Sequence, residues 1–267
     1  MYFRDPVFVE GHGLRFACAT ARAWWYSAWL RSLARFSRTY LGSFWLGLSN
    51  LLSVALLGAV YGAVLKVPNP FQYVIYLGLG LTIWGFINQS VISGCALFTV
   101  RRDQLVNNAL PAIFYCLEEW AFQMQTFAQA LAIILVAFAF IQPLVLLHSL
   151  TSLWLPLLNL GLFCFWITVA MSIFGARFKD FCQLAPILLQ LMFLVSPILY
   201  HREALGSIEL LANLNPFYRI LAPVRSAIID GRVHLWSELL TLILNLIAIV
   251  AVVLVLKRVR YRLPLWV

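Results

Sequence analysis

The sequence contains few charged residues. Asp, Glu, Lys and Arg make up 11% of its 267 residues, whereas 63% are hydrophobic and the mean hydropathy is +0.90. This composition excludes an ordinary soluble domain and indicates a polytopic membrane protein. Residues 1–16 show no apolar run followed by a small-residue cleavage site, so we expect no cleavable signal peptide. No internal repeat is evident, and we expect one membrane domain over residues 1–267.

The motifs of several enzyme and transporter classes are also missing. None of the three lysines (Lys66, Lys179, Lys257) follows the glycines of a phosphate-binding loop, so a nucleotide-driven pump would need its ATPase on a separate chain. The five cysteines show no metal-ligand spacing. Intramembrane carboxylates, which proton-coupled carriers normally use, are almost absent. We expect no catalytic residues, no metal site and no cofactor in this chain.

Six apolar segments are each about long enough to cross a membrane, which takes ~20 mostly apolar residues. The six expected spans are residues 44–65, 73–98, 122–147, 153–174, 181–200 and 235–256. The sequence therefore predicts an all-α integral membrane protein with six transmembrane helices.

The distribution of Lys and Arg predicts the orientation. With both termini on one side, that side holds fourteen of the 19 basic residues and the other side holds five. By the positive-inside rule, both termini are cytoplasmic. The net charge of +9 thus follows the topology, and we expect no nucleic-acid partner.

Residues 23–40, before the first span, show the pattern of an amphipathic helix in the cytoplasmic interface. The aromatic and apolar residues that recur at helical spacing are Trp25, Trp29, Leu33, Phe36 and Tyr40. Arg31, Arg35 and Arg38 fall on the opposite face, toward anionic groups. The segment is either an ordinary topological anchor or a substrate-handling element, and the pattern leaves both open.

Residues 201–234 lie between two strong spans but cannot cross. Their first apolar run is too short, and Arg219 and Arg225 interrupt the second. Asn215 and Pro216 fit a helix start, an N-cap followed by proline at the first helical position. We expect a re-entrant pair of short helices on the external side. Such backbone is tolerated at membrane depth only when buried in protein or lining a wet cavity, so it indicates a gate.

The polar insert at residues 100–120 is the longer cytoplasmic connection. Pro111 predicts two short helices that meet at a bend. The insert and the shorter connection at residues 175–181 are candidate coupling surfaces, although ordinary positive-inside loops would show the same composition.

Five sequence segments together carry a family resemblance. They are SRTYLGSFW (37–45), FQYVIYLGLGLTIWGF (71–86), RRDQLVNNALP (101–111), ARFKDFCQLAPILLQLMFLVSPILY (176–200) and NPFYRILAPVRSAIIDG (215–231). In this order the chain resembles the transmembrane subunit of ABC-2 type transporters. It is most similar to the polysaccharide-exporting branch, the O-antigen, capsular polysaccharide and teichoic acid permeases. It departs at LVNNALP, where the family more often has a basic pair before the aromatic-proline step.

The resemblance implies a homodimer with two copies of a cytoplasmic ABC ATPase, which would bind ATP and Mg, in the bacterial inner (plasma) membrane. The substrate would be a polyprenyl-diphosphate-linked glycan, as in lipopolysaccharide biosynthesis. The first and fifth spans would line its path, with candidate lining residues Tyr40, Trp45, Tyr61, Phe181, Phe193 and Tyr200. Candidates for the diphosphate headgroup are Arg35, Arg38, Arg101 and Arg102. The external gate would include Asn215, Pro216, Arg219 and Arg225, and ATPase coupling would involve Asp103, Gln104, Asn107 and Asn108.

Two other functions remain open at this point. An ABC-2 exporter of a small amphiphile, drug or lipid would share the fold but use a lateral, lipid-facing path. A membrane-embedded transferase acting on a polyprenyl substrate would need acidic residues converging at a membrane face. The few carboxylates present mostly neighbour arginines, which disfavours the transferase.

Overall fold

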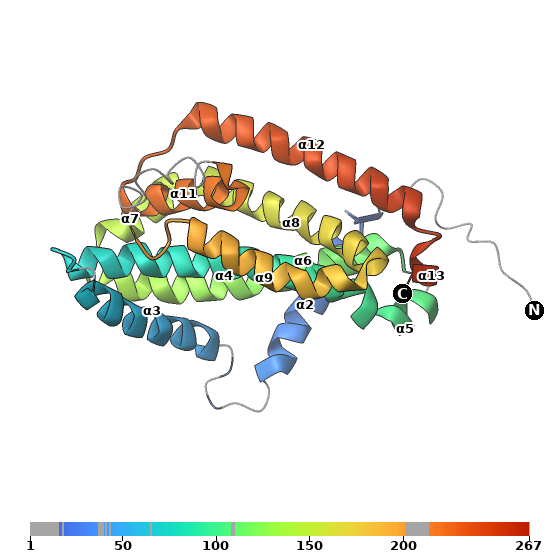
Figure 1. Ribbon diagram of the computed structural model, residues 1–267, viewed down its shortest axis with the longest axis horizontal. Helices are drawn as coiled ribbons and strands as arrows, with labels where there is room; N and C mark the ends of the chain where they lie inside the picture. Colours follow the sequence, from blue (N-terminus) through green and yellow to red (C-terminus); the bar gives the residue numbers. More distant parts are fainter. Residues whose placement is uncertain are drawn as a thin grey trace, which may run out of the picture.

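The computed structural model describes residues 16, 17, 19–36, 40, 42, 44–64, 66–107, 110–200 and 214–266. These residues form helices and no strands, which confirms the all-α prediction (Figure 1). The helices are α2 (Ala21–Phe36), α3 (Phe44–Val64), α4 (Pro70–Val100), α5 (Arg102–Asn107), α6 (Ala112–Ala139), α7 (Leu144–Ser152), α8 (Trp154–Arg177), α9 (Lys179–Val195), α11 (Pro216–Ile229), α12 (Leu235–Val259) and α13 (Leu263–Trp266).

Five of the described helices are long and apolar enough to cross a membrane. They are α3, α4, α6, α8 and α12. The segment predicted as a span over residues 181–200 differs: α9 has 17 residues and ends at Val195. Pro197 explains this end, because the residue before a proline is disfavoured in the helical conformation, and Ser196 is indeed extended. Residues 196–200 continue without helix.

The predicted third span, residues 122–147, is also displaced. Helix α6 begins ten residues earlier, at Ala112, and ends at Ala139. A separate short helix, α7, follows Pro143. The expected bend at Pro111 is present, because α5 precedes it and Pro111 is the N-cap of α6. However, the second short helix expected in the insert is the first part of the long helix α6.

Helix α4 lies at the centre of the bundle. It packs against α3, α6, α8, α9 and α11. Asn69 caps its start by accepting a hydrogen bond from the backbone of Gln72, and Pro70 occupies the first helical turn. A Cβ on Gly94 would lie 2.9 Å from the Thr168 carbonyl oxygen, so α4 and α8 approach closely at this glycine.

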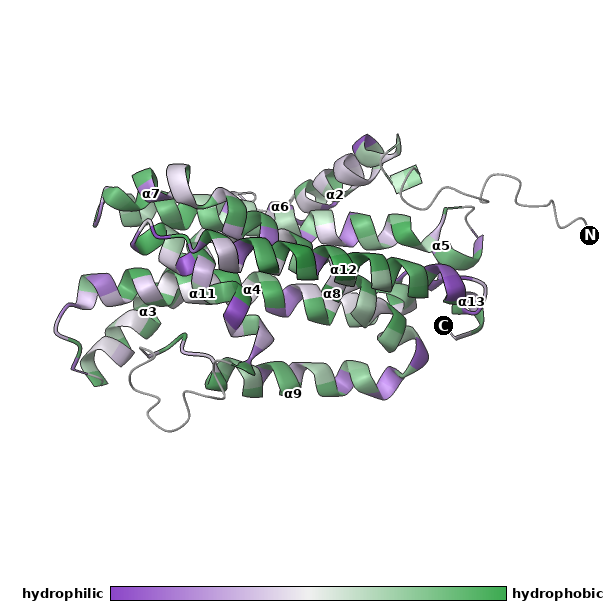
Figure 2. Ribbon diagram, turned by 90° about the horizontal axis from the view of Figure 1, so that it is seen from above, coloured by the Kyte–Doolittle hydropathy of each residue, from purple (hydrophilic) through white to green (hydrophobic). Residues whose placement is uncertain are grey.

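The connections gather at the two ends of the bundle. Helices α5 and α13 lie at one end, and α7 and α11 lie at the other (Figure 1). Figure 2 shows α3 and α9 on one side of the bundle, with α2 and α7 on the opposite side. Apolar residues face outward along much of these helices, as expected for a protein surrounded by lipid.

Candidate functional site

An ion-pair cluster joins three elements at the end of the bundle that carries α5. Two adjacent carboxylates of α6, Glu118 and Glu119, are buried there. Arg31 of α2 lies 2.6 Å from a Glu119 oxygen and 3.6 Å from a Glu118 oxygen. Arg101, just before α5, donates to Glu118 at 2.8 Å. Two arginines thus neutralise two carboxylates and connect α2, α6 and the α4–α5 junction, which we call the Arg31–Glu119 cluster.

Neutral groups complete this cluster. Gln123, one turn along α6, donates to Glu119 at 2.8 Å and approaches the Ser93 hydroxyl of α4 at 3.3 Å. The Arg31 guanidinium carbon also lies 3.9 Å from the centroid of the Phe122 ring. The sequence predicted that Arg31 faces anionic groups, and the groups that it meets are these two carboxylates of the same chain. Arg31 turns toward α6, because two buried carboxylates there need a cation.

The headgroup candidates that the structure describes have different surroundings. Arg35 is exposed on the last turn of α2, and it too has an interaction partner. Arg38 lies outside the described residues. Arg101 is engaged by Glu118 and Gln104, whereas Arg102 is exposed at the start of α5.

The coupling candidates lie together on a surface helix. Asp103, Gln104 and Asn107 belong to α5, which has no buried residue, and all three are exposed. The Gln104 carbonyl accepts a hydrogen bond from the Tyr115 hydroxyl at 3.1 Å, which fastens α5 to α6. Asn108 lies outside the described residues.

The aromatic path candidates separate into exposed and packed residues. Tyr40, just before α3, and Trp45, in its first turn, are both exposed. Tyr61, near the other end of α3, is half-buried. Phe193 packs its ring 5.6 Å from that of Trp84 in the core, so it is a packing residue.

The other two aromatic candidates are half-buried at the two ends of the α9 region. Phe181 lies 5.9 Å from the Phe174 ring. Tyr200 donates to the Leu194 carbonyl. The six candidates therefore differ in their burial, from the exposed Tyr40 and Trp45 to Phe193 packed against the core.

Uncharged polar groups on α9 have a clearer arrangement. Gln183 and Gln190 are both exposed and lie two turns apart, so they share one face of the helix. On α3, the hydroxyl-bearing residues Ser49 and Ser53 are likewise exposed. These two helices lie on the same side of the bundle (Figure 2).

The helix start predicted at Asn215 is confirmed. Asn215 is the N-cap of α11, its side chain accepts from the Phe217 backbone at 3.0 Å, and Pro216 occupies the first turn. The Asn215 amide also donates to the Ser196 hydroxyl at 2.8 Å, which ties α11 to the end of α9. The first helix expected in this region falls on residues 201–213, outside the described residues.

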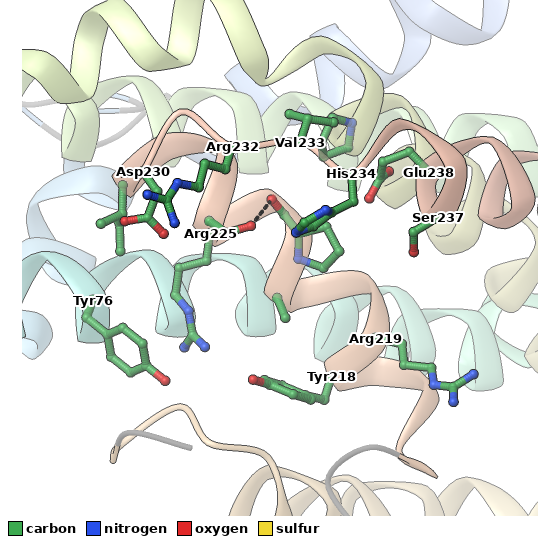
Figure 3. A pocket seen from close by; sticks show the side chains of 15 residues that line it. Tyr76, Tyr218, Arg219, Arg225, Asp230, Arg232, Val233, His234, Ser237 and Glu238 are labelled. Atoms are coloured by element: carbon green, nitrogen blue, oxygen red, sulfur yellow. Dashed lines mark hydrogen bonds between the residues drawn. The ribbon is translucent and has the colours of Figure 1, made fainter. Parts of the chain in front are cut away.

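The two gate arginines have different environments. Arg219 is exposed, whereas Arg225 is buried and extends between Tyr76 and Tyr218 (Figure 3). The Arg225 guanidinium lies 3.7 Å from the Tyr76 ring centroid and donates to the Pro197 carbonyl at 3.0 Å. Burial lowers the pKa of Arg225, while Tyr76 and Tyr218 act in the opposite direction. Arg225 thus fixes the non-helical segment after α9 against α11.

Sequence reasoning missed the role of Glu118 and Glu119. The expected polar insert at residues 100–120 included them, but they lie within the long helix α6. A usable signal was present: two carboxylates next to an apolar run require cations, and Arg31 and Arg101 are among the few available.

Comparison with known proteins identifies the family. Residues 25–229 match the ABC-2 type transporter family, which covers more than half of the chain and includes the Arg31–Glu119 cluster and α11. A search of curated proteins found no match. The chain therefore belongs to the ABC-2 type transporter family, as the multi-pass transmembrane subunit of an ABC transporter that works with a partner ATPase.

Proposed function

We propose that two copies of this chain and two ATPase subunits export a polyprenyl-diphosphate-linked polysaccharide, similar to an O-antigen, across a bacterial inner membrane. The exposed polar residues of α3 and α9 carry this proposal. An amide in contact with lipid tails has no hydrogen-bond partner, which is costly. Gln183 and Gln190 have no partner within the part of the chain that the structure describes. A second copy facing α3 and α9 would enclose them in a hydrated path.

The chemistry of such a path suits a sugar polymer. Glycans offer many hydroxyl groups and few charges. As a glycan moves, its hydroxyls can therefore form hydrogen bonds with one neutral side chain of the path after another. Among the exposed side chains of α3 and α9, the polar ones are amides and hydroxyls, and no Asp, Glu, Lys or Arg lies between Phe181 and Val195. A path lined this way would bind no single sugar tightly, which favours movement.

The proposal also includes a membrane crossing by α9, the fifth of the six expected spans. A helix of 17 residues is about 26 Å long, slightly short of the ~30 Å hydrocarbon core. The following residues 196–200 extend it, and their backbone carbonyls are satisfied by protein: Tyr73 donates to Leu199 at 2.6 Å and Tyr76 to Pro197 at 2.8 Å. Protein-satisfied irregular backbone is the kind tolerated at membrane depth. Helix α11 would then return to the external side as part of the gate.

Energy coupling would enter at α5. This helix exposes Asp103, Gln104 and Asn107, and the Arg31–Glu119 cluster connects its start to α2 and α6. A movement that the ATPase imposes on α5 would therefore be transmitted to α2 and to the spanning helix α6 through these ion pairs.

Deletion and complementation test the function. In a strain without the gene, full-length lipid-linked glycan should accumulate in the cytoplasm and disappear from the surface. The double variant Gln183→Leu/Gln190→Leu should restore at most about one tenth of surface glycan at wild-type membrane abundance. A control pair on the exposed apolar face of α12, Leu240→Ala/Ile247→Ala, should restore it fully.

Two results would reject the proposal. Normal surface glycan in the deletion strain would show that the substrate is different. If that strain instead became sensitive to an amphiphilic drug, the chain would be an exporter of small amphiphiles. The apolar residues Ile187, Leu191 and Leu194, exposed on α9 beside the glutamines, are the feature that such an exporter would use.

A further inference from the structure

A cavity of about 880 Å³ lies between α11 and the beginning of α12 (Figure 3). It is at the end of the bundle that carries α7, away from the Arg31–Glu119 cluster. Helix α4 contributes Tyr76 and α8 contributes Pro156, and the other lining residues belong to α11, α12 and the connection between them. This volume is within the ~300–1,000 Å³ range of small-ligand sites.

The buried wall of the cavity carries a guanidinium. Arg225 is 5% exposed, and no carboxylate pairs with it among the described residues. Its N–H groups reach the Pro197 carbonyl and the hydroxyls of Tyr76 and Tyr218, all of which are uncharged. A buried charge normally needs an opposite charge or full hydrogen bonding, because desolvation is expensive. An anion in the cavity would supply the missing charge.

The rim adds further positive charge. Arg219 and Arg232 are exposed at the cavity, so three arginines line it against two carboxylates, Asp230 and Glu238. Glu238 is directed to α8, where its carboxylate accepts a 2.6 Å hydrogen bond from the Asn159 amide. The cavity therefore favours an anion.

The neighbouring surface is apolar and faces outward. Leu235 and Trp236, at the start of α12 directly after the cavity residue His234, are 64% and 88% exposed. Exposed tryptophan at the end of a spanning helix is typical of the headgroup level of a membrane. An anion reaching the cavity would therefore have hydrocarbon beside it, as the headgroup of a lipid does.

We propose that this cavity binds the phosphate of a lipid headgroup at the non-cytoplasmic membrane surface. Arginine forks match phosphate oxygens, and Arg225 with Arg232 would approach the phosphate from the wall and from the rim. The lipid is either a glycerophospholipid of that leaflet or the exported polyprenyl lipid. The identification of the lipid as the exported polyprenyl lipid rests on the function proposed above, and so does the choice of leaflet.

Arg225 also has a structural role, because it holds Pro197. That role explains its contact with the segment after α9 but not the cavity or the two rim arginines. The test therefore uses residues that do not touch Pro197. Arg232→Gln removes a rim charge, and Ala222→Trp fills the cavity while keeping every charge.

Native mass spectrometry of the purified full-length chain in detergent measures lipid binding. The probes are phosphatidylglycerol and undecaprenyl phosphate. Each of the two variants should bind at least fivefold less of one or both probes than the wild type. Arg258→Gln, which removes an exposed arginine at the other end of α12, should bind normally.

The outcomes separate the sources. Preferential loss of undecaprenyl phosphate identifies the exported lipid, and equal loss of both probes identifies the leaflet lipid. Unchanged binding by both cavity variants, at the wild-type unfolding temperature, would refute the site. Displacement of either lipid by millimolar inorganic phosphate would make it a free-anion site and overturn the lipid assignment. Because the assay involves no transport, failure of the export proposal would leave this result unaffected.

Discussion

Charged side chains are few in this chain, and each buried carboxylate among the described residues has an identified partner. Glu119 is held by Arg31 and Gln123, and Glu118 is held by Arg101. On α8, the Asn159 side chain donates to the Glu238 carboxylate and the Asn159 backbone carbonyl accepts from the Asn245 amide, which joins α8 to α12. Since these contacts replace the solvation that water would give, each partner becomes a requirement for the other.

Glu119→Gln should therefore destabilise the attachment of α2 to α6. The variant leaves Arg31 with one carboxylate, Glu118, at the longer distance of 3.6 Å. We expect the free energy of unfolding to fall by about 1–3 kcal/mol. This is less than for a fully buried pair, because the Arg31 side chain is 29% exposed. The measurement is thermal unfolding in detergent, with Asp103→Asn on the exposed helix α5 as the control. Equal unfolding temperatures for the two variants would show that the pair contributes nothing.

Individual residues were predictable where the reason is local. Asn215 and Pro216 mark a helix start through their own chemistry, so the sequence predicts it. Arg31 pairs with Glu119, 88 positions away, and periodicity alone could not identify this partner. Likewise, nothing local indicates that Arg225 is buried while Arg219, six positions earlier, is exposed.

Helices in this bundle approach closely where glycine removes a side chain. A Cβ on Gly175 of α8 would lie 2.0 Å from the Cys95 carbonyl oxygen of α4 and 3.0 Å from the sulfur of Cys182 on α9. Three helices therefore meet at this glycine. Small residues permit such contacts in membranes, where burial of apolar surface offers no driving force between helices.

Gly175→Ala should consequently destabilise the protein strongly. The new methyl would meet backbone atoms, which cannot rotate away as a side chain can. We expect the free energy of unfolding to fall by about 1–3 kcal/mol, the usual range for overpacking. Gly85→Ala is the matched control, because its Cβ would meet nothing within 4 Å and alanine is the better helix former. Size-exclusion chromatography after heating compares the two. A Gly175→Ala variant as heat-resistant as Gly85→Ala would contradict the observed helix contact.

Elements were predicted well where hydropathy and helix length agree. The first, second, fourth and sixth expected spans correspond to α3, α4, α8 and α12 with small shifts at their ends. The start of α6 was missed because its first turns carry Glu118 and Glu119, which lower hydropathy although both are buried. The extent of α9 was missed because residues 196–200 remain apolar after Pro197 ends the helix.

The number of crossings decides the architecture of the whole molecule. Five crossings, counting only the long helices, would place the two ends of the described chain on opposite sides of the membrane. A sixth crossing by α9 places them on the same side. The structure gathers α5 and α13 at one end of the bundle and α7 and α11 at the other, the arrangement that the proposed sixth crossing would give.

Cysteine labelling distinguishes five crossings from six. In a chain whose five native cysteines are replaced, we introduce Lys66→Cys, Asp103→Cys, Arg232→Cys or Arg262→Cys, all at exposed positions. A membrane-impermeant thiol reagent added outside intact cells should label the variants at 66 and 232 and leave those at 103 and 262 unlabelled until the cells are opened. Positions 66 and 103 flank α4, so they calibrate the assay on a helix whose crossing is not in question. If α9 does not cross, the labels at 232 and 262 exchange: 262 would react outside and 232 would be protected. That exchange would place the lipid-phosphate cavity on the cytoplasmic side and remove α11 from any external gate.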